Sequence, residues 1–244
     1  MDDRVILRMD EALRLLRDGD IEVVGRIVQA SNATLFCSIE VDGISASCVY
    51  KPIAGERPLW DFPEGTLAGR EVAAFLVSEA TGWHIVPPTV YRDGPFGPGM
   101  CQLWIDVDET ADILALARSQ DPGLRRMAVF DAVVNNADRK GGHLLPTCGG
   151  HVYGVDHGVC FSVDDKLRTV LWQWRGRRLP DDVVPPLRQL DEDLADGGRL
   201  AEALDGLLTG EEVAVTRERV SRLLRTGVFP DPPDDWPAVP WPPI

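Results

Sequence analysis

Strand-like segments are confined to the first part of this chain, whereas helix-like segments dominate the second part. Alternating or β-branched hydrophobic residues mark five strand-like segments before residue 107, at 21–29, 34–43, 44–53, 87–92 and 99–106. A run of strands followed by a run of helices is typical of an α+β fold. The pattern therefore predicts two lobes. Residues 1–105 would form an antiparallel five-stranded sheet with one inserted helix, and residues 106–244 a mainly helical lobe.

Turn and cap signals between these segments support the prediction. Asp42 and Gly43 join the second and third strands and are typical of a two-residue hairpin turn. A helical pattern at 66–81 ends before Gly82, which suits a left-handed helix cap. We expect further helices at 10–17, 123–135, 198–208 and 211–226.

The C-terminal segment, "VFPDPPDDWPAVPWPPI", differs in composition from the rest of the chain. A proline-rich segment can be an extended ligand for another protein. We instead expect it to wrap the helical lobe, with Phe229, Trp236 and Trp241 as anchors, because tryptophan side chains are uncommon in water.

Charge and composition limit the partners and the location of the protein. The net charge is −14, which disfavours nucleic acid and anionic membrane surfaces, because both carry negative charge. No apolar stretch approaches the roughly 20 residues of a membrane span, so stable membrane insertion is not expected. The N-terminus has acids where a signal peptide needs bases, and the cysteines follow no paired motif. We therefore expect a cytoplasmic protein with free thiols.

Several charged residues stand where they need partners. Lys51 ends the predicted third strand, where a lysine is costly unless it is paired, and Glu71 follows 20 residues later on the next helix. The segments "NADRKGGH" and "VDHG" supply four more polar groups: Asp138, Lys140, His143 and Asp156. Phosphoryl transfer needs such a set, with one carboxylate to orient a hydroxyl, a lysine at the γ-phosphate, and ligands for a divalent cation.

The order Lys, Glu, Asp-x-Lys-x-x-His, Asp-x-Gly resembles the protein-kinase-like superfamily. The phosphatidylinositol 3-/4-kinases, in particular the type II phosphoinositide 4-kinases, and the HipA-type kinases are the most similar in "NADRKGGH" and "VDHGVCF", and "CQLWI" falls where their interlobe hinge would be. The whole chain is also similar to an actinobacterial branch of that superfamily, above all in "VYKPIAGERPLWDFPEGTLAGRE".

The resemblance implies a bilobal kinase fold and ATP-dependent transfer of a γ-phosphate to a hydroxyl of a protein, a lipid headgroup or a small molecule. It implies that Lys51, held by Glu71, binds the α- and β-phosphates of ATP. Asp138 would be the base, Lys140 would meet the γ-phosphate, and Asn136 would brace the loop. The implied ligands of a Mg²⁺ or Mn²⁺ ion are Asp156 and His143.

Two further segments are expected to contact ATP. "ASNAT" stands where a phosphate-binding loop would be, so we expect phosphate contacts from Ser31, Asn32 and Thr34. The hinge position implies contacts from Gln102, Leu103 and Trp104.

The chain departs from the kinase pattern at two places. His143 replaces an asparagine, and imidazole suits Mn²⁺ better than Mg²⁺, unless Asp156 and water hold the metal without it. "ASNAT" contains no glycine. These departures favour an alternative, a nucleotide-binding pseudokinase that acts as a scaffold or regulator.

Two other groups of residues have functional interpretations. His143, Cys148 and His151 have a spacing at which a structural zinc site is conceivable. Residues 166–178 follow Asp156 where a kinase presents its acceptor, and their bases predict an anionic acceptor, although a solvated loop is the alternative. These bases are Lys166, Arg168, Arg175, Arg177 and Arg178.

Overall fold

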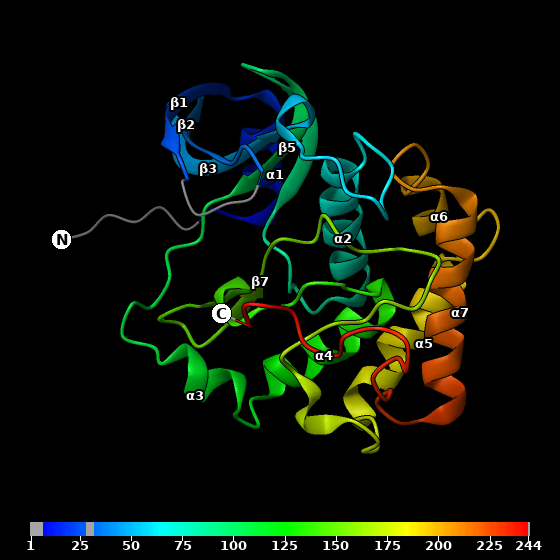
Figure 1. Cartoon of the computed structure of the whole chain (residues 1–244). Helices are drawn as coiled ribbons and strands as arrows, with labels where there is room; N and C mark the ends of the chain where they lie inside the picture. The colour runs from blue at the N-terminus through cyan, green and yellow to red at the C-terminus, as the bar shows by residue number, and fades with distance from the viewer. Residues whose placement is uncertain (1–6, 28–31, 244) are drawn as a thin grey trace.

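The computed structural model describes residues 7–27 and 32–243. Its antiparallel sheet lies at one end of the molecule and most of the helices lie at the other (Figure 1). The predicted α+β fold is therefore confirmed.

The sheet has five strands in the order β1-β2-β3-β5-β4, and every neighbouring pair is antiparallel. The strands are β1 (Asp20–Arg26), β2 (Leu35–Val41), β3 (Ile44–Pro52), β4 (Thr89–Gly94) and β5 (Gly97–Leu103). The turn between β2 and β3 has the predicted hairpin geometry, because Asp42 and Gly43 both have positive φ, at 51° and 77°. Helix α1 (Met9–Asp18) packs on this sheet through Leu15 and Leu16.

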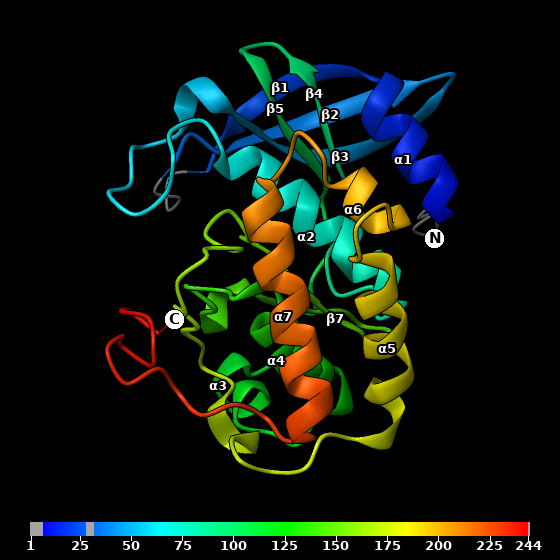
Figure 2. The ribbon, with the colours of Figure 1, turned by 90° about the vertical axis from the view of Figure 1, so that its right-hand side faces the viewer.

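Helix α2 (Leu67–Thr81) lies between the sheet and the helical lobe (Figure 2). Most of its residues are buried, because it contacts β4 and β5 on one side and α5 and α6 on the other. Gly69 lies against Leu207, and Arg70 forms a buried ion pair with Glu212 of α7. As predicted, Gly82 caps the helix in the left-handed conformation, with φ 66°.

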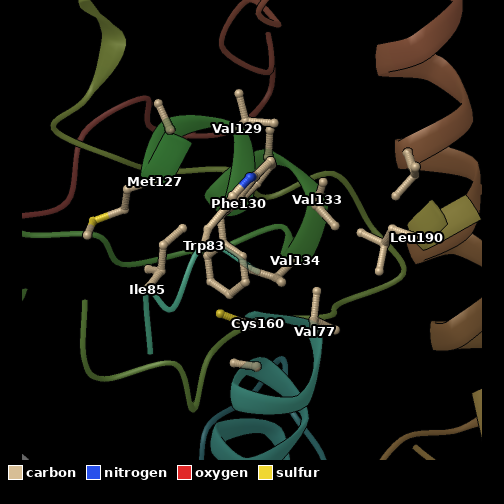
Figure 3. Close-up of a cluster of buried hydrophobic side chains, with 14 of the residues drawn as sticks. Val77, Trp83, Ile85, Met127, Val129, Phe130, Val133, Val134, Cys160 and Leu190 are labelled. Carbon is tan, nitrogen blue, oxygen red and sulfur yellow. The ribbon is translucent and has the colours of Figure 1, made fainter. Parts of the chain in front are cut away.

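The helical lobe contains the remaining α-helices and a short hairpin. These elements are α3 (Ile113–Ala117), α4 (Pro122–Val134), β6 (Leu144–Pro146), β7 (Val152–Gly154), α5 (Val184–Asp193), α6 (Arg199–Ala203) and α7 (Gly210–Thr226). Short 3₁₀ helices occur at Ile53–Gly55, Gly141–His143, Trp172–Trp174 and Asp181–Val183. The core of the lobe surrounds Phe130 of α4 (Figure 3). Within the described residues, none of the helices combines the length and the hydrophobicity needed to cross a membrane.

The C-terminal segment leaves α7 and runs back across the helical lobe (Figure 1). Phe229 is buried and Trp236 is partly buried, in agreement with the expectation that both are anchors. The same expectation for Trp241 is wrong, because 87% of its surface is exposed. Here the backbone makes the contact instead, since the Pro243 carbonyl accepts a hydrogen bond from the Gly141 N–H at 2.8 Å.

Candidate functional site

A cleft of about 520 Å³ lies between the sheet and the helical lobe. Its walls come from β3, the N-terminal part of α2, the loop at 56–62, the loop at 137–143, the segment at 156–159, and the C-terminal segment. The cleft brings together eight of the residues predicted from the sequence: Asn32, Thr34, Lys51, Glu71, Asp138, Lys140, His143 and Asp156.

Lys51 projects from the end of β3 toward α2 and carries two carboxylate partners. Its Nζ lies 2.7 Å from Glu71 Oε1 and also contacts Asp156 Oδ1. Burial alone would lower the pKa of Lys51, but the carboxylates of Asp156 and Glu71 outweigh it and raise the pKa above its usual value. The cleft therefore holds a permanently charged ammonium group.

Glu71 connects α2 with the segment that follows β7. One carboxylate oxygen accepts from Lys51, and the other accepts the backbone N–H of His157 at 2.9 Å. The side chain is 4% exposed, so both contacts are shielded from water. The position of Lys51 is thus coupled to the position of Asp156.

Asp156 and His143 lie next to each other in the lining of the cleft. The ammonium group of Lys51 holds the pKa of Asp156 well below its usual range, against the effect of burial. Nε2 of His143 lies 3.5 Å from Oδ2 of Asp156. Burial lowers the pKa of His143, although Asp156 opposes this shift, so the imidazole is neutral at physiological pH. A carboxylate and a neutral imidazole are therefore available together.

The loop that carries Asp138 is braced from both sides. Asn136 accepts the backbone N–H of Asp138 at 2.9 Å through Oδ1 and donates to Asp131 Oδ1 at 3.0 Å through Nδ2. The carboxylate of Asp138 lies 2.9 Å from Lys140 Nζ and 3.3 Å from Arg168 Nη2. Arg168 also donates to the carbonyl of Ala137 at 2.6 Å, which places a second cation beside Asp138.

The sequence interpretation missed an ion pair beneath this loop. Arg139 and Asp131 are both fully buried and are joined by contacts of 2.8 and 3.0 Å. Arg139 also donates to the carbonyl of Val155 at 3.0 Å, and its Nη2 lies 2.6 Å from His157 Nε2. The available signal was Asp131 itself, because an acid inside the apolar helix sequence "MAVFDAVV" needs a buried partner.

The hinge residues do not line the cleft. Gln102 is buried and donates to Thr89 Oγ1 at 2.8 Å. The Leu103 N–H is bonded to the Pro88 carbonyl at 2.9 Å, and the Trp104 ring packs edge-on against Phe36 at 4.9 Å. Contacts of these three residues with ATP stay a prediction, and Ser31 lies outside the described residues.

The basic segment does not present a row of bases to the cleft, as the sequence had suggested. Only Arg168 among the five bases lines it. Lys166 is 7% exposed and pairs with Asp61 at 3.0 Å, among the rings of Trp60, Phe62 and Trp236. The three arginines after residue 174 are exposed and lie outside the cleft lining: Arg175, Arg177 and Arg178.

The donor set favours a cation shared with a nucleotide over a structural metal. No group of three or more His, Cys, Asp or Glu side chains that could hold a metal occurs in the described part of the chain. His143, Cys148 and His151 therefore do not form the alternative zinc site. Mg²⁺ and Mn²⁺ are commonly held by one or two protein ligands together with phosphate oxygens and water, and Asp156 with His143 fits that pattern.

The chain is similar in fold to several solved structures, two of which are named as kinases. They include the hydra Fam20 structure with sugar, with a TM-score of 0.58, 14% identity and coverage of 93% of this chain and 90% of that chain. The Golgi casein kinase has a TM-score of 0.53, 14% identity and coverage of 92% and 74%. The Helicobacter pylori proinflammatory kinase CtkA has a TM-score of 0.52 and 11% identity, with coverage of 88% of this chain and 94% of that chain. At these identities the likeness shows the fold alone, and it confirms the protein-kinase-like prediction. The finer resemblance to phosphoinositide and HipA kinases stays a prediction.

A comparison of sequences identifies a family. No protein-family model matches the chain. Protein Rv2133c of Mycobacterium tuberculosis (strain ATCC 25618 / H37Rv) is 44% identical over 96% of this chain and 95% of that protein. This chain, which has a protein-kinase-like fold, therefore belongs to the same family as Rv2133c.

Proposed function

We propose that the chain is an ATP-dependent phosphotransferase that moves the γ-phosphate of ATP to a hydroxyl group. One observation carries the proposal: the Lys51–Glu71 pair, the Asp138 loop and the Asp156–His143 pair line a single cleft in a kinase-like fold. Because phosphoryl transfer depends mainly on positioning and charge neutralisation, this set of groups suffices for the reaction.

Each group has a distinct task in this proposal. Lys51 binds the α- and β-phosphates, and Glu71 fixes its position. Lys140 neutralises charge on the γ-phosphate. Asp138 orients the acceptor hydroxyl and accepts its proton, while Asn136 holds the backbone of Asp138 in place. The oxygen of the acceptor forms a bond to the γ-phosphorus as the bond to the β–γ bridging oxygen breaks, and ADP leaves.

A divalent cation fits beside Asp156 and His143, which would hold it together with oxygens of ATP. When bound, it supplies positive charge to the phosphates. Lys51 contacts one oxygen of Asp156, and the other oxygen faces His143. Mg²⁺ and Mn²⁺ are both candidates, and the imidazole favours Mn²⁺.

A nucleotide-binding scaffold without transfer is the second candidate. The observation in its favour is the segment "ASNAT", which has no glycine where a phosphate loop would be. The presence of Asp138 beside the cations of Lys140 and Arg168 favours a phosphotransferase over a scaffold.

Replacing Lys51 with methionine is expected to remove the stabilisation of the protein by ATP. At an ATP concentration 100 times Kd, binding stabilises the native chain by about 2.7 kcal/mol, and a variant without the phosphate contact should gain little of this. The measurement is thermal unfolding with and without Mg²⁺ and ATP. Arg175→Met, which removes an exposed cation outside the cleft, is the matched control. Equal ATP affinity in the Lys51 variant and the native chain would refute the assignment of Lys51.

Replacing His143 with asparagine is expected to shift the metal preference from Mn²⁺ toward Mg²⁺. An amide oxygen is a harder ligand than imidazole, so it favours the harder cation. The ratio of ATP affinities in Mn²⁺ and in Mg²⁺, measured by calorimetry, reports the change. His151→Asn is the control, because His151 is exposed and bonds the His84 carbonyl instead. An unchanged ratio would show that His143 does not contact the metal.

A further inference from the structure

The C-terminal segment 236–243, here called the tail, is hydrogen-bonded to the loop that carries Asp138 and to the segment at 169–172. The carbonyl of Ala238 accepts from the N–H of Thr169 at 3.0 Å and from Nε1 of Trp172 at 2.7 Å. The carbonyl of Pro243 accepts from the N–H of Gly141 at 2.8 Å. The tail is therefore part of the rim of the cleft.

These contacts use the backbone groups that an extended peptide would need. Peptides commonly bind by adding a strand to a free edge. Residues 168–170 already pair with Arg139 on one side, since Arg139 donates to the Arg168 carbonyl at 3.0 Å and accepts from Val170 at 3.1 Å. The tail occupies the other side through Ala238. An incoming peptide strand would have to displace the tail to pair with Thr169 on that side.

Aromatic rings of the tail and of the loop at 56–62 meet at the outer side of the cleft. Trp236 of the tail lines the cleft, and its ring lies 6.3 Å from that of Trp60, which belongs to the loop between β3 and α2. Lys166 joins the two sides, because its Nζ lies 5.2 Å from both rings and 3.0 Å from Asp61. The tail, the basic segment and the loop at 56–62 are thus connected across the outer side of the cleft.

We infer that the acceptor is a small hydroxyl compound that binds in the cleft beside Trp236, and not a protein segment. This inference rests on the proposed phosphotransfer. A volume of about 520 Å³ is the size of a small-molecule site, and part of it must hold ATP. The guanidinium of Arg168 lies 5.8 Å from the centre of the Trp236 ring and 3.3 Å from Asp138, so it connects the tail with the reacting groups.

The test separates acceptors by size. One mycobacterial cell extract is divided into its dialysable small molecules, its retained proteins and its chloroform-soluble lipids, and each fraction is incubated with the full chain and γ-labelled ATP. We expect label in the dialysable fraction alone. Label in the proteins or the lipids would overturn the inference. Protein labelling that appears only after deletion of residues 232–244 would also overturn it, because the tail would then be a removable inhibitor.

Two variants and one exchange measurement complete the test. Trp236→Ala should raise the KM for the dialysable acceptor with ATP affinity unchanged, whereas Trp241→Ala, at a ring 87% exposed, should change neither. The amides of Gly141 and Thr169 should exchange slowly in the full chain and at least an order of magnitude faster after the deletion. If no fraction is labelled while ATP still binds, the proposed phosphotransfer fails. Amide exchange then tests separately whether the tail covers the side of the cleft. Rapid exchange of the Gly141 and Thr169 amides in the full chain would show that it does not.

Discussion

Replacing Asp138 with asparagine should lower the rate of phosphotransfer by roughly 10²–10⁴-fold, the usual contribution of general acid–base catalysis. Asparagine keeps the shape of the side chain but cannot accept the proton of the acceptor. The affinity for ATP should change little, because Asp138 pairs with Lys140 and Arg168 and not with Lys51. Single-turnover transfer from labelled ATP and calorimetric titration of the same preparation measure the two effects separately.

Asp156→Asn is the matched control for this experiment. It should weaken metal-dependent ATP binding as well as transfer, because Asp156 faces His143 and Lys51 in the proposed metal site. The reverse pattern, with binding lost in the Asp138 variant and kept in the Asp156 variant, would mean that the two roles are exchanged. Absence of transfer in the native chain, with ATP binding intact, would favour the nucleotide-binding scaffold.

Replacing Arg139 with methionine should destabilise the protein by about 3–5 kcal/mol, because it leaves the carboxylate of Asp131 buried without its cation. Both side chains are fully buried in the native structure. Urea unfolding of the apo protein measures the loss.

Two comparisons keep this prediction specific. Arg178→Met removes one partner of an exposed ion pair with Asp181 and should have little measurable effect on unfolding. The double variant Asp131→Leu, Arg139→Met removes both buried charges and should recover part of the lost stability. If Arg139→Met were as stable as the native chain, the ion pair would not hold the loop together.

Much of the fold could be predicted because its signals are local. Strand periodicity, the Asp42-Gly43 turn and the Gly82 cap each depend on a few neighbouring residues. Helix α5 was not predicted, because it begins "VPP" and prolines usually end helices. Proline is tolerated in the first turn, where its missing N–H has no helical acceptor.

Site residues could be predicted where their order along the chain indicates their partners. They could not be predicted where the partner of a side chain lies far away in the sequence. Lys51 and Glu71 stand out because a strand lysine needs a carboxylate. The bases at 166–178 were counted as free charges, but Asp61, 105 residues earlier, pairs with Lys166 and removes it from the cleft. No local pattern reveals a partner so far away. The contact of Arg139 with Asp131 was missed for another reason, because Arg139 lies in the motif "NADRKGGH", whose other residues already had a functional interpretation.

The attachment of α2 to the helical lobe has a consequence for the control of the protein. Arg70 and Glu212 join α2 to α7 in the interior, and a side chain at Gly69 would meet the Leu207 carbonyl at 3.2 Å. Swinging α2 outward would separate a buried ion pair and would lose the packing of Gly69 on Leu207. The Lys51–Glu71 contact is therefore expected to form as the chain folds and to persist. Control by a signal that displaces α2 is therefore not expected, because such a signal would have to separate Arg70 from Glu212.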